Sequence, residues 1–303
     1  MKYNKIVLAG GSGYIGRVLA RNFRDRCKQI IILSRKARPQ AGNITTIVWD
    51  GKNPGNWQYE IDGADILINL TGKSVDCRYN KRNRTEILNS RIDAITALNK
   101  AVNQLAIKPR LFLNISSATI YRHAEDHAQD EQHGEYGEGF SVDVCTAWEN
   151  AFFEQNAPVR KATLRMAIVL GAKAGALPQY IKLTRMGFGG IQGNGKQMFS
   201  WIHEDEISDM TDFLYARNDL SGVFNASSPN PVNNKMLMQL LRQKLKVSFG
   251  IPTSKWMIEI GTALAGTEAE LVLKSRWVLP QRLLQEGYVF QHPNLDEALN
   301  TII

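Results

Sequence analysis

The sequence predicts an α/β protein with a doubly wound parallel sheet, and two patterns in the first half of the chain carry this prediction. Short runs of strand length alternate with longer amphipathic segments, and the runs are apolar at nearly every position. Such strands are typical of a parallel sheet that helices cover on both faces. The predicted strands are residues 5–9, 29–33, 45–49, 66–70, 111–115 and 162–169, and the predicted helices between them are 14–26, 84–105 and 141–154.

The texture of the sequence changes after residue 170. Glycines become frequent between 171 and 195, around a short helical segment at 178–185. Helical patterns return further on, at 205–217, 233–244, 255–266, 280–284 and 295–302. We therefore expect a sheet domain over 1–170 and a smaller lobe over 171–303, with the second part interleaved with the sheet.

Composition narrows the class of partner. The 303 residues are 44% hydrophobic, which suffices for a large core, and the net charge of +8 favours an anionic partner. A phosphorylated cofactor or a small anionic molecule meets this need as well as nucleic acid does. The Lys and Arg residues are dispersed, without a basic stripe interleaved with aromatics, which argues against nucleic acid.

Cysteine usage and hydropathy indicate the compartment. Cys27, Cys77 and Cys145 lack the paired spacing of a zinc site or of a disulfide framework, so we expect no metal and a reducing environment. The apolar run before Gly10 is too short for a signal peptide, and no other run reaches the length of a membrane span. We expect a cytoplasmic protein without membrane contact. Its oligomeric state stays open.

A glycine-rich loop lies between the first predicted strand and the first predicted helix. Gly10, Gly13 and Gly16 have the spacing of a dinucleotide-binding loop, and this position strengthens the motif. Gly10 permits a tight turn, Gly13 lets backbone N–H groups approach a pyrophosphate at the positive helix end, and Gly16 allows close packing of helix on strand. The alternative is a simple glycine turn. The loop predicts a Rossmann dinucleotide site.

The end of the second strand indicates which dinucleotide is bound. An Asp or Glu there usually binds the ribose 2′-hydroxyl of NAD, but this chain has Ser34 and Arg35. A guanidinium can donate paired hydrogen bonds to a 2′-phosphate, so the sequence favours NADP(H) over NAD(H). Arg35 as a solvated surface charge is the alternative. Asp50, after the third strand, could accept from the adenine amino group or cap the following turn.

Two segments resemble those of extended short-chain dehydrogenases/reductases. The run 115–121, Ile-Ser-Ser-Ala-Thr-Ile-Tyr, is similar to their Ser-Ser-Ala-Thr-Val-Tyr segment. The runs 193–197, Gly-Asn-Gly-Lys-Gln, and 202–206, Ile-His-Glu-Asp-Glu, resemble their later Gly-x-Gly-x-Gln and His-Val-Asp-Asp segments. The resemblance implies a Rossmann sheet of the extended type with a smaller C-terminal lobe that binds the substrate.

A closer resemblance, over nearly the full length, is to an atypical branch of that superfamily. Its proteins are named epimerase family proteins, nucleoside-diphosphate-sugar epimerases or cell-division-inhibitor-like proteins, and their substrate is not established. The marks in this chain are 69–74, 90–91, 148–149, 187–190, 201–203, 278–283 and 287–288.

This resemblance implies a set of cofactor-binding residues. The loop residues at the pyrophosphate are Gly10, Gly11, Ser12, Gly13, Tyr14 and Ile15, and the further candidates are Ser34, Arg35, Asp50, Leu70, Thr71, Gly72, Glu86, Arg91, Ser116 and Ala167. Two alternatives remain open. Arg91 could instead form a helix-surface salt bridge with Glu86 or Asp93, and Ala167 could simply pack in its strand.

The usual catalytic pair of the superfamily is missing. A Tyr and a Lys four residues later normally share one helix face, where the Lys lowers the pKa of the phenol. Ser141 and Cys145 stand at these positions. The residues that could replace the phenol are Tyr79, Tyr121 and Tyr136, if the fold brings one of them near the nicotinamide. Met198 also stands where sugar-nucleotide enzymes commonly place an Arg for the diphosphate.

Three residues remain as catalytic candidates. Ser117 could bind a carbonyl or alcohol oxygen, Thr119 lies two residues further, and His203 could act as an acid or base near neutral pH. A hydroxyl that satisfies backbone groups and a hydrogen-bonded structural His are the alternatives. The leading hypothesis is an atypical NADP(H)-dependent oxidoreductase or epimerase-like enzyme that acts on a small carbonyl or alcohol. The rival is a non-catalytic NADP(H)-binding module that senses redox state or regulates a partner.

Overall fold

The computed structural model describes residues 1–154 and 158–303 and has a seven-stranded parallel sheet at its centre. The strand order β10-β6-β5-β4-β1-β2-β3 reverses direction at β1, as in a doubly wound fold. The predicted fold class is confirmed. The strands of this sheet are β1 (Tyr3–Ala9), β2 (Cys27–Ser34), β3 (Ile44–Val48), β4 (Ile66–Asn69), β5 (Leu111–Ser117), β6 (Lys161–Met166) and β10 (Gly222–Ala226).

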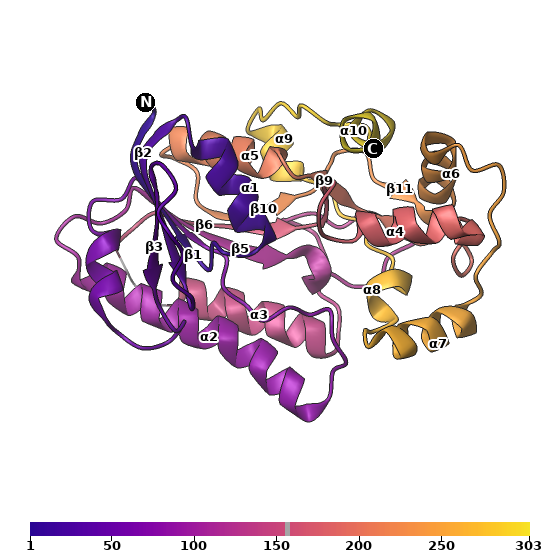
Figure 1. The fold of residues 1–303 in the computed structure, drawn as a ribbon, viewed down its shortest axis with the longest axis horizontal. Helices are drawn as coiled ribbons and strands as arrows, with labels where there is room; N and C mark the ends of the chain where they lie inside the picture. Colours follow the sequence, from indigo (N-terminus) through magenta and orange to yellow (C-terminus); the bar gives the residue numbers. More distant parts are fainter. Residues whose placement is uncertain (155–157) are drawn as a thin grey trace.

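Helices cover both faces of the sheet (Figure 1). On one face lie α2 (Lys81–Gln104) and α3 (Phe140–Phe153), and on the other lie α1 (Tyr14–Phe23) and α5 (Glu206–Ala216). In β1, Ile6 packs into the core on one face and Val7 into the core on the other. Successive side chains of a strand alternate between faces, so a strand buried on both sides is apolar throughout.

The second half of the chain forms a smaller group of elements beside the carboxyl edge of the sheet (Figure 1). Its own apolar cluster includes Leu177, Trp201, Leu237 and Leu299. The helices of this group are α4 (Leu177–Leu183), α6 (Asn234–Leu245), α7 (Lys255–Ala265), α8 (Glu270–Leu273) and α10 (Leu295–Ile302), whereas α9 (Gln281–Gln285) packs beside β10. Its short strands are β7 (Ile168–Leu170), β8 (Met198–Phe199), β9 (Trp201–His203) and β11 (Val232–Asn233).

The structure differs from the sequence prediction in two strands of the sheet, since β10 was not predicted and the strand predicted at 162–169 is divided. Residues 162–169 were expected to form a single strand, but β6 ends at Met166 and β7 begins at Ile168. The N–H of Ala167 donates to Ala226 O at the end of β10, and β7 then pairs with β9 outside the main sheet. Apolar composition alone does not reveal this change of partner, because both strands are apolar.

None of the described helices has the length and apolar character that crossing a membrane requires.

Candidate cofactor and substrate site

The glycine loop connects β1 to α1 at the carboxyl edge of the sheet. Gly10 has φ +77°, and a Cβ there would lie 3.0 Å from the backbone of Thr71. A Cβ on Gly16 would lie 2.2 Å from the carbonyl oxygen of Gly11. Gly13 precedes the first residue of α1 and offers no side chain to cap the helix. The loop therefore lets a ligand approach the backbone N–H groups at the start of α1. This is the arrangement that binds a pyrophosphate.

Two other side chains near the loop, those of Tyr14 and Ser34, form hydrogen bonds within the protein. The phenol of Tyr14 donates to the carboxylate of Glu204, which follows β9. At the end of β2, Ser34 is buried and its Oγ accepts from the N–H of Lys36, while Arg35 is exposed. Glu204, in the second half of the chain, thus contacts the first residue of the helix that follows the glycine loop. The side chain of Arg35 is left in solvent.

Asp50 caps a turn, which is one of the two roles that the sequence left open. Its Oδ1 accepts from the backbone N–H of Lys52 at 3.0 Å and from that of Asn53 at 2.9 Å. These backbone hydrogen bonds hold the pKa of the exposed carboxyl below its usual range.

The end of β4 carries a buried amide network. Asn69 donates to Asn114 Oδ1 at 2.8 Å and accepts from Thr71 Oγ1 at 2.6 Å. The N–H of Leu70 donates to Ala9 O, so the turn after β4 lies beside the end of β1. Leu70 and Thr71 therefore lie next to the glycine loop, where the resemblance expects them.

Arg91 lies under this turn rather than on the helix surface. It donates to the carbonyl oxygens of Lys73 and Ile87, its Cζ is 4.9 Å from the ring of Trp148, and it sits directly against Gly72. Among the described residues it has no ion pair with Glu86 or Asp93. Burial lowers the pKa of Arg91.

Glu86 pairs instead with Lys73 and Arg82. Its carboxylate accepts from both cations, and these hydrogen bonds lower its pKa to about 2. The helix-surface salt bridge considered for Arg91 is thus replaced by a different pairing of Glu86.

Ser117 ends β5 at the carboxyl edge of the sheet and is half-buried. A single 3-10 turn over Ala118–Ile120 follows it, and Ser117 Oγ accepts from the N–H of Thr119 at 3.2 Å. Among the described residues no acceptor is recorded for the hydroxyl proton. The side chain therefore satisfies one backbone group and still has a donor to offer.

Ser116 faces the opposite way, into a buried charged network. Its Oγ donates to Glu149 Oε1 at 2.7 Å, and Glu149 Oε2 is 2.7 Å from Arg165 Nη2. Arg165 also donates to the phenol oxygens of Tyr121 and Tyr136. Sequence reasoning did not assign roles to Glu149 and Arg165. An arginine within the apolar run of β6 was the available signal, since a buried charge needs a partner.

The first two turns of α3 hold Ser141 and Cys145, the residues that the resemblance places at the positions of the usual catalytic pair. Ser141 Oγ donates to Glu270 Oε2 at 3.3 Å. Cys145 is buried, and burial together with the nearby Glu149 raises the pKa of its thiol to about 12. Tyr79 lies against Ser141, and burial raises the pKa of this phenol while hydrogen bonding from Ser141 opposes the shift. Tyr79 is thus a candidate phenol that interacts with Ser141, the residue at the position of the missing tyrosine.

The C-terminal half contributes residues that sequence reasoning missed. Lys274 Nζ donates to Thr119 O at 2.8 Å, and Arg276 Nε donates to Thr119 Oγ1 at 3.4 Å. Glu268 Oε1 accepts from the N–H of Tyr79 at 2.7 Å. The segment around α8 therefore spans the turn after β5 and the segment before α2.

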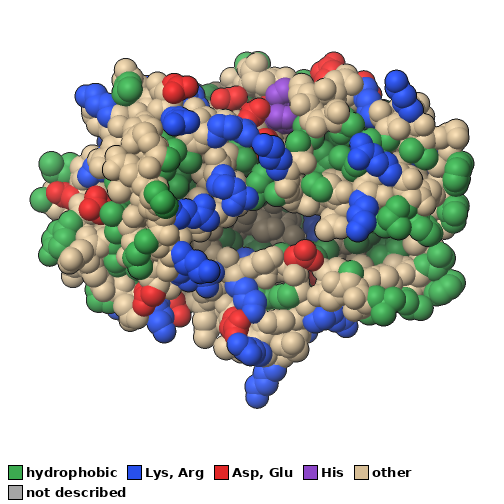
Figure 2. Space-filling model, viewed as in Figure 1, with side chains coloured by type: hydrophobic (Ala, Val, Ile, Leu, Met, Phe, Trp, Pro, Cys, Tyr) green, Lys and Arg blue, Asp and Glu red, His purple; other side chains and the backbone are tan. Residues whose placement is uncertain are grey.

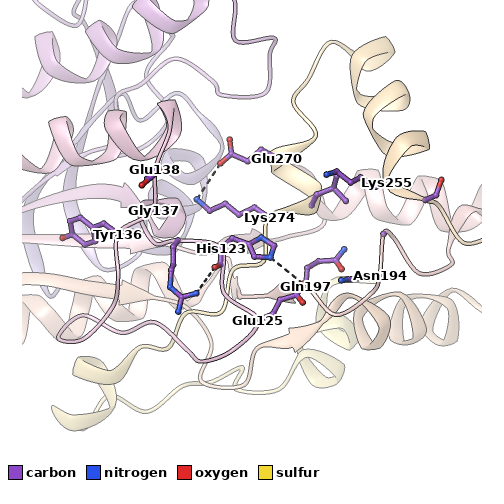
Figure 3. Close-up of a pocket in the computed structure, with 14 residues that line it drawn as sticks. His123, Glu125, Tyr136, Gly137, Glu138, Asn194, Gln197, Lys255, Glu270 and Lys274 are labelled. Carbon is purple, nitrogen blue, oxygen red and sulfur yellow. Dashed lines mark hydrogen bonds and ion pairs between the residues drawn. The ribbon is translucent and has the colours of Figure 1, made fainter.

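A large cavity lies beside this segment. Its volume is about 1180 Å³, which exceeds the usual range for small-molecule sites, and it is open to solvent. Figure 3 shows Lys274 and Glu270 reaching toward each other, with Tyr136 on one side and Gln197 on the other. The face of the molecule in Figure 2 is hollowed near its centre, and Lys and Arg side chains gather beside the hollow.

The structure does not bring His203 to Ser117 and Thr119 through any recorded contact of the described residues. His203 is buried, its ring centroid is 3.9 Å from that of His292, and its Nδ1 accepts from the N–H of Asp205. Its Nε2 is 3.2 Å from Thr301 Oγ1 on α10. These contacts are those of the structural His that the sequence left as an alternative. Burial and His292 lower its pKa.

Comparisons with known proteins agree with this geometry. Residues 6–227 match the model of the NAD dependent epimerase/dehydratase family, and residues 254–302 match a Domain of unknown function (DUF1731). The epimerase family protein YfhF of Bacillus subtilis is 28% identical over 98% of this chain and 97% of its own length. The mouse epimerase family protein SDR39U1 is 27% identical over 99% of each.

Among solved structures, the human epimerase family protein SDR39U1, crystallised with NADPH, is similar with a TM-score of 0.85. It is 27% identical, and the match covers 98% of both chains. A nucleoside-diphosphate sugar epimerase from Corynebacterium glutamicum has a TM-score of 0.77 at 26% identity, with 98% of this chain and 57% of the other covered. The chain therefore belongs to the NAD-dependent epimerase/dehydratase family, in its atypical short-chain dehydrogenase/reductase branch.

Proposed function

We propose that this protein is an NADP(H)-dependent oxidoreductase or epimerase-like enzyme that acts on a small carbonyl or alcohol in the cytoplasm. The observation that carries the proposal is the position of Ser117, whose free donor lies at the carboxyl edge of the sheet that also carries the glycine loop. Ligands of doubly wound sheets bind at this edge.

The chain's own residues fit a dinucleotide. A Cβ at Gly16 would overlap with the backbone of Gly11, so the close packing that brings the start of α1 to the glycine loop requires a residue without a side chain there. The N-terminus of α1 would face the pyrophosphate, and Arg35 would pair with a 2′-phosphate, which favours NADP(H) over NAD(H). The human relative crystallised with NADPH supports this choice.

The bound dinucleotide would supply or accept a hydride at its nicotinamide. Ser117 would donate a hydrogen bond to the carbonyl oxygen and stabilise the negative charge that develops on it. Cys145 cannot supply the positive charge of the usual lysine, since burial raises the pKa of its thiol and keeps it neutral at physiological pH. We expect a proton donor other than Ser141, whose hydroxyl donates to Glu270, and Cys145, whose raised pKa makes it a weak acid.

The experiment compares Ser117→Ala with Ser141→Ala and Cys145→Ala in a screen of NADPH oxidation with small carbonyl compounds. We expect Ser117→Ala to lower turnover by about a hundredfold while NADPH affinity changes little. The other two variants should stay within about fivefold of the wild type. Full turnover by Ser117→Ala would contradict the proposed role.

A second candidate function is a non-catalytic NADP(H)-binding module. The replacement of the usual Tyr and Lys by Ser141 and Cys145 favours it. This second function would be supported if the wild-type protein binds NADPH but none of the carbonyl compounds in the screen leads to NADPH oxidation.

A further inference from the structure

Two buried cations meet at one residue beside the cavity. Lys274 and Arg276 both donate to Thr119, the first to its carbonyl oxygen and the second to its hydroxyl. The side chain of Lys274 is 9% exposed, and Arg276 is 7% exposed. We call Lys274 and Arg276 the Thr119 cation pair. Thr119, to which both cations donate, lies two residues from Ser117 along the chain.

The protein compensates this charge only in part. Among the described residues, Arg276 hydrogen-bonds to neutral oxygens alone, those of Thr119, Leu271 and Lys274. Lys274 forms one ion pair, with Glu270, whose Oε1 lies 3.7 Å from Nζ. Two cations and one half-exposed carboxylate leave one excess positive charge.

Other carboxylates near the pair are engaged or solvated. Glu149 is bound by Arg165, and Glu268 accepts from Arg78 and from the N–H of Tyr79. Glu125 and Glu138 line the same cavity but are exposed, where water screens their charge. The protein balances the charge of these buried cations only in part, and an added anion at the cavity wall would offset the excess, so the site favours an anionic ligand.

We propose that the cavity binds a substrate that carries a carboxylate, and that Lys274, supported by Arg276, is the residue that holds this carboxylate. The excess of one charge matches a monoanion better than a dianionic phosphate. Lys274 lines the cavity, and its contact with Thr119 places it next to the turn that begins at Ser117. The inference rests on the proposed function for the role of the bound acid as substrate, since it names the substrate class of that site.

The experiment compares two probes that differ by one charge, 4-carboxybenzaldehyde and 4-formylbenzamide. Binding to the protein, with and without saturating NADP⁺, is measured by isothermal titration calorimetry. We expect the carboxylate to bind at least about tenfold more tightly than the amide, with a preference that shrinks as salt is added. Equal affinities, or no binding of the carboxylate, would overturn the proposal.

Variants locate the site. Lys274→Met should abolish the preference for the carboxylate, and Lys274→Arg should keep most of it because the charge remains. The matched control is Lys255→Met, which removes a cation that lines the same cavity but has a 76% exposed side chain. A preference retained in Lys274→Met or lost in Lys255→Met would contradict the assignment.

Controls distinguish a lost carboxylate preference from a failure to fold and from an absence of turnover. Thermal unfolding checks each variant, and if Lys274→Met does not fold, Lys274→Arg and the salt dependence of the wild type still decide the proposal. The binding measurement needs no turnover. If the protein prefers the carboxylate probe but none of the carbonyl compounds leads to NADPH oxidation, the carboxylate site stands and the proposed oxidoreductase function fails.

Discussion

At the scale of single residues, the start of α3 carries a buried, neutral side chain where the resemblance places a catalytic one. Cys145 stands where a lysine is usual, and Glu149 follows one helical turn later in a buried ion pair with Arg165. The guanidinium of Arg165 donates to two phenols, so its charge is used within the fold. The surroundings of Cys145 therefore favour a neutral side chain and not a reactive one.

We predict that Cys145 resists alkylation in the folded protein. Its thiol pKa of about 12 lies above the ordinary value of 9.0, so the thiolate that reacts is scarcer at pH 8 by a factor of about a thousand. Iodoacetamide labelling mapped by mass spectrometry should modify the partly exposed Cys77 first. Labelling of Cys145 in the native protein as fast as in urea would refute this prediction.

Individual site residues differ in how far the sequence alone identifies them. The glycine loop, Leu70, Thr71 and Ser117 are recognisable because each lies at the end of an apolar strand whose position the sequence predicts. Their roles stay predictions. Lys274 carries no such mark, since it contacts Thr119 across 155 residues of chain. Only the folded structure shows that pairing.

At the scale of elements, the turn from β1 to α1 depends on backbone contact. A Cβ at Gly16 would overlap with Gly11, so α1 can pack on the strand only when residue 16 lacks a side chain. The sequence predicts this element well because strand, loop and helix are contiguous. It does not predict the end of β6 at Met166, and it misses β10, a five-residue strand that contains the polar Asn225.

We predict that Gly16→Ala destabilises the protein by about 1–3 kcal/mol and weakens NADPH binding, because the loop must shift to admit the methyl group. The matched control is Gly261→Ala in α7, where a Cβ meets no atom within 4 Å. This change should be neutral or stabilising by up to about 1 kcal/mol. Urea unfolding measures both, and equal stabilities for Gly16→Ala and the wild type would rule out the packing account.

At the scale of the whole molecule, the two halves of the sequence are interwoven. Strand β10 completes one edge of the sheet, and Leu283, Tyr288 and Phe290 pack into the core that lies under α1 and α5. The fold class was predictable because it follows from local patterns repeated along the chain. The cavity was not, since its walls come from 122–138, 193–197 and 254–274, which only tertiary packing brings together.

The measurement that tests the account most directly is the affinity of the purified protein for NADPH and for NADH, followed by fluorescence titration. A 2′-phosphate paired with Arg35 should make NADPH bind at least about tenfold more tightly, which corresponds to roughly 1.4 kcal/mol. Arg35→Ala should remove this preference while the affinity for NADH changes little. Equal affinities for the two dinucleotides in the wild type, or an unchanged ratio in Arg35→Ala, would contradict the proposed NADP(H) site.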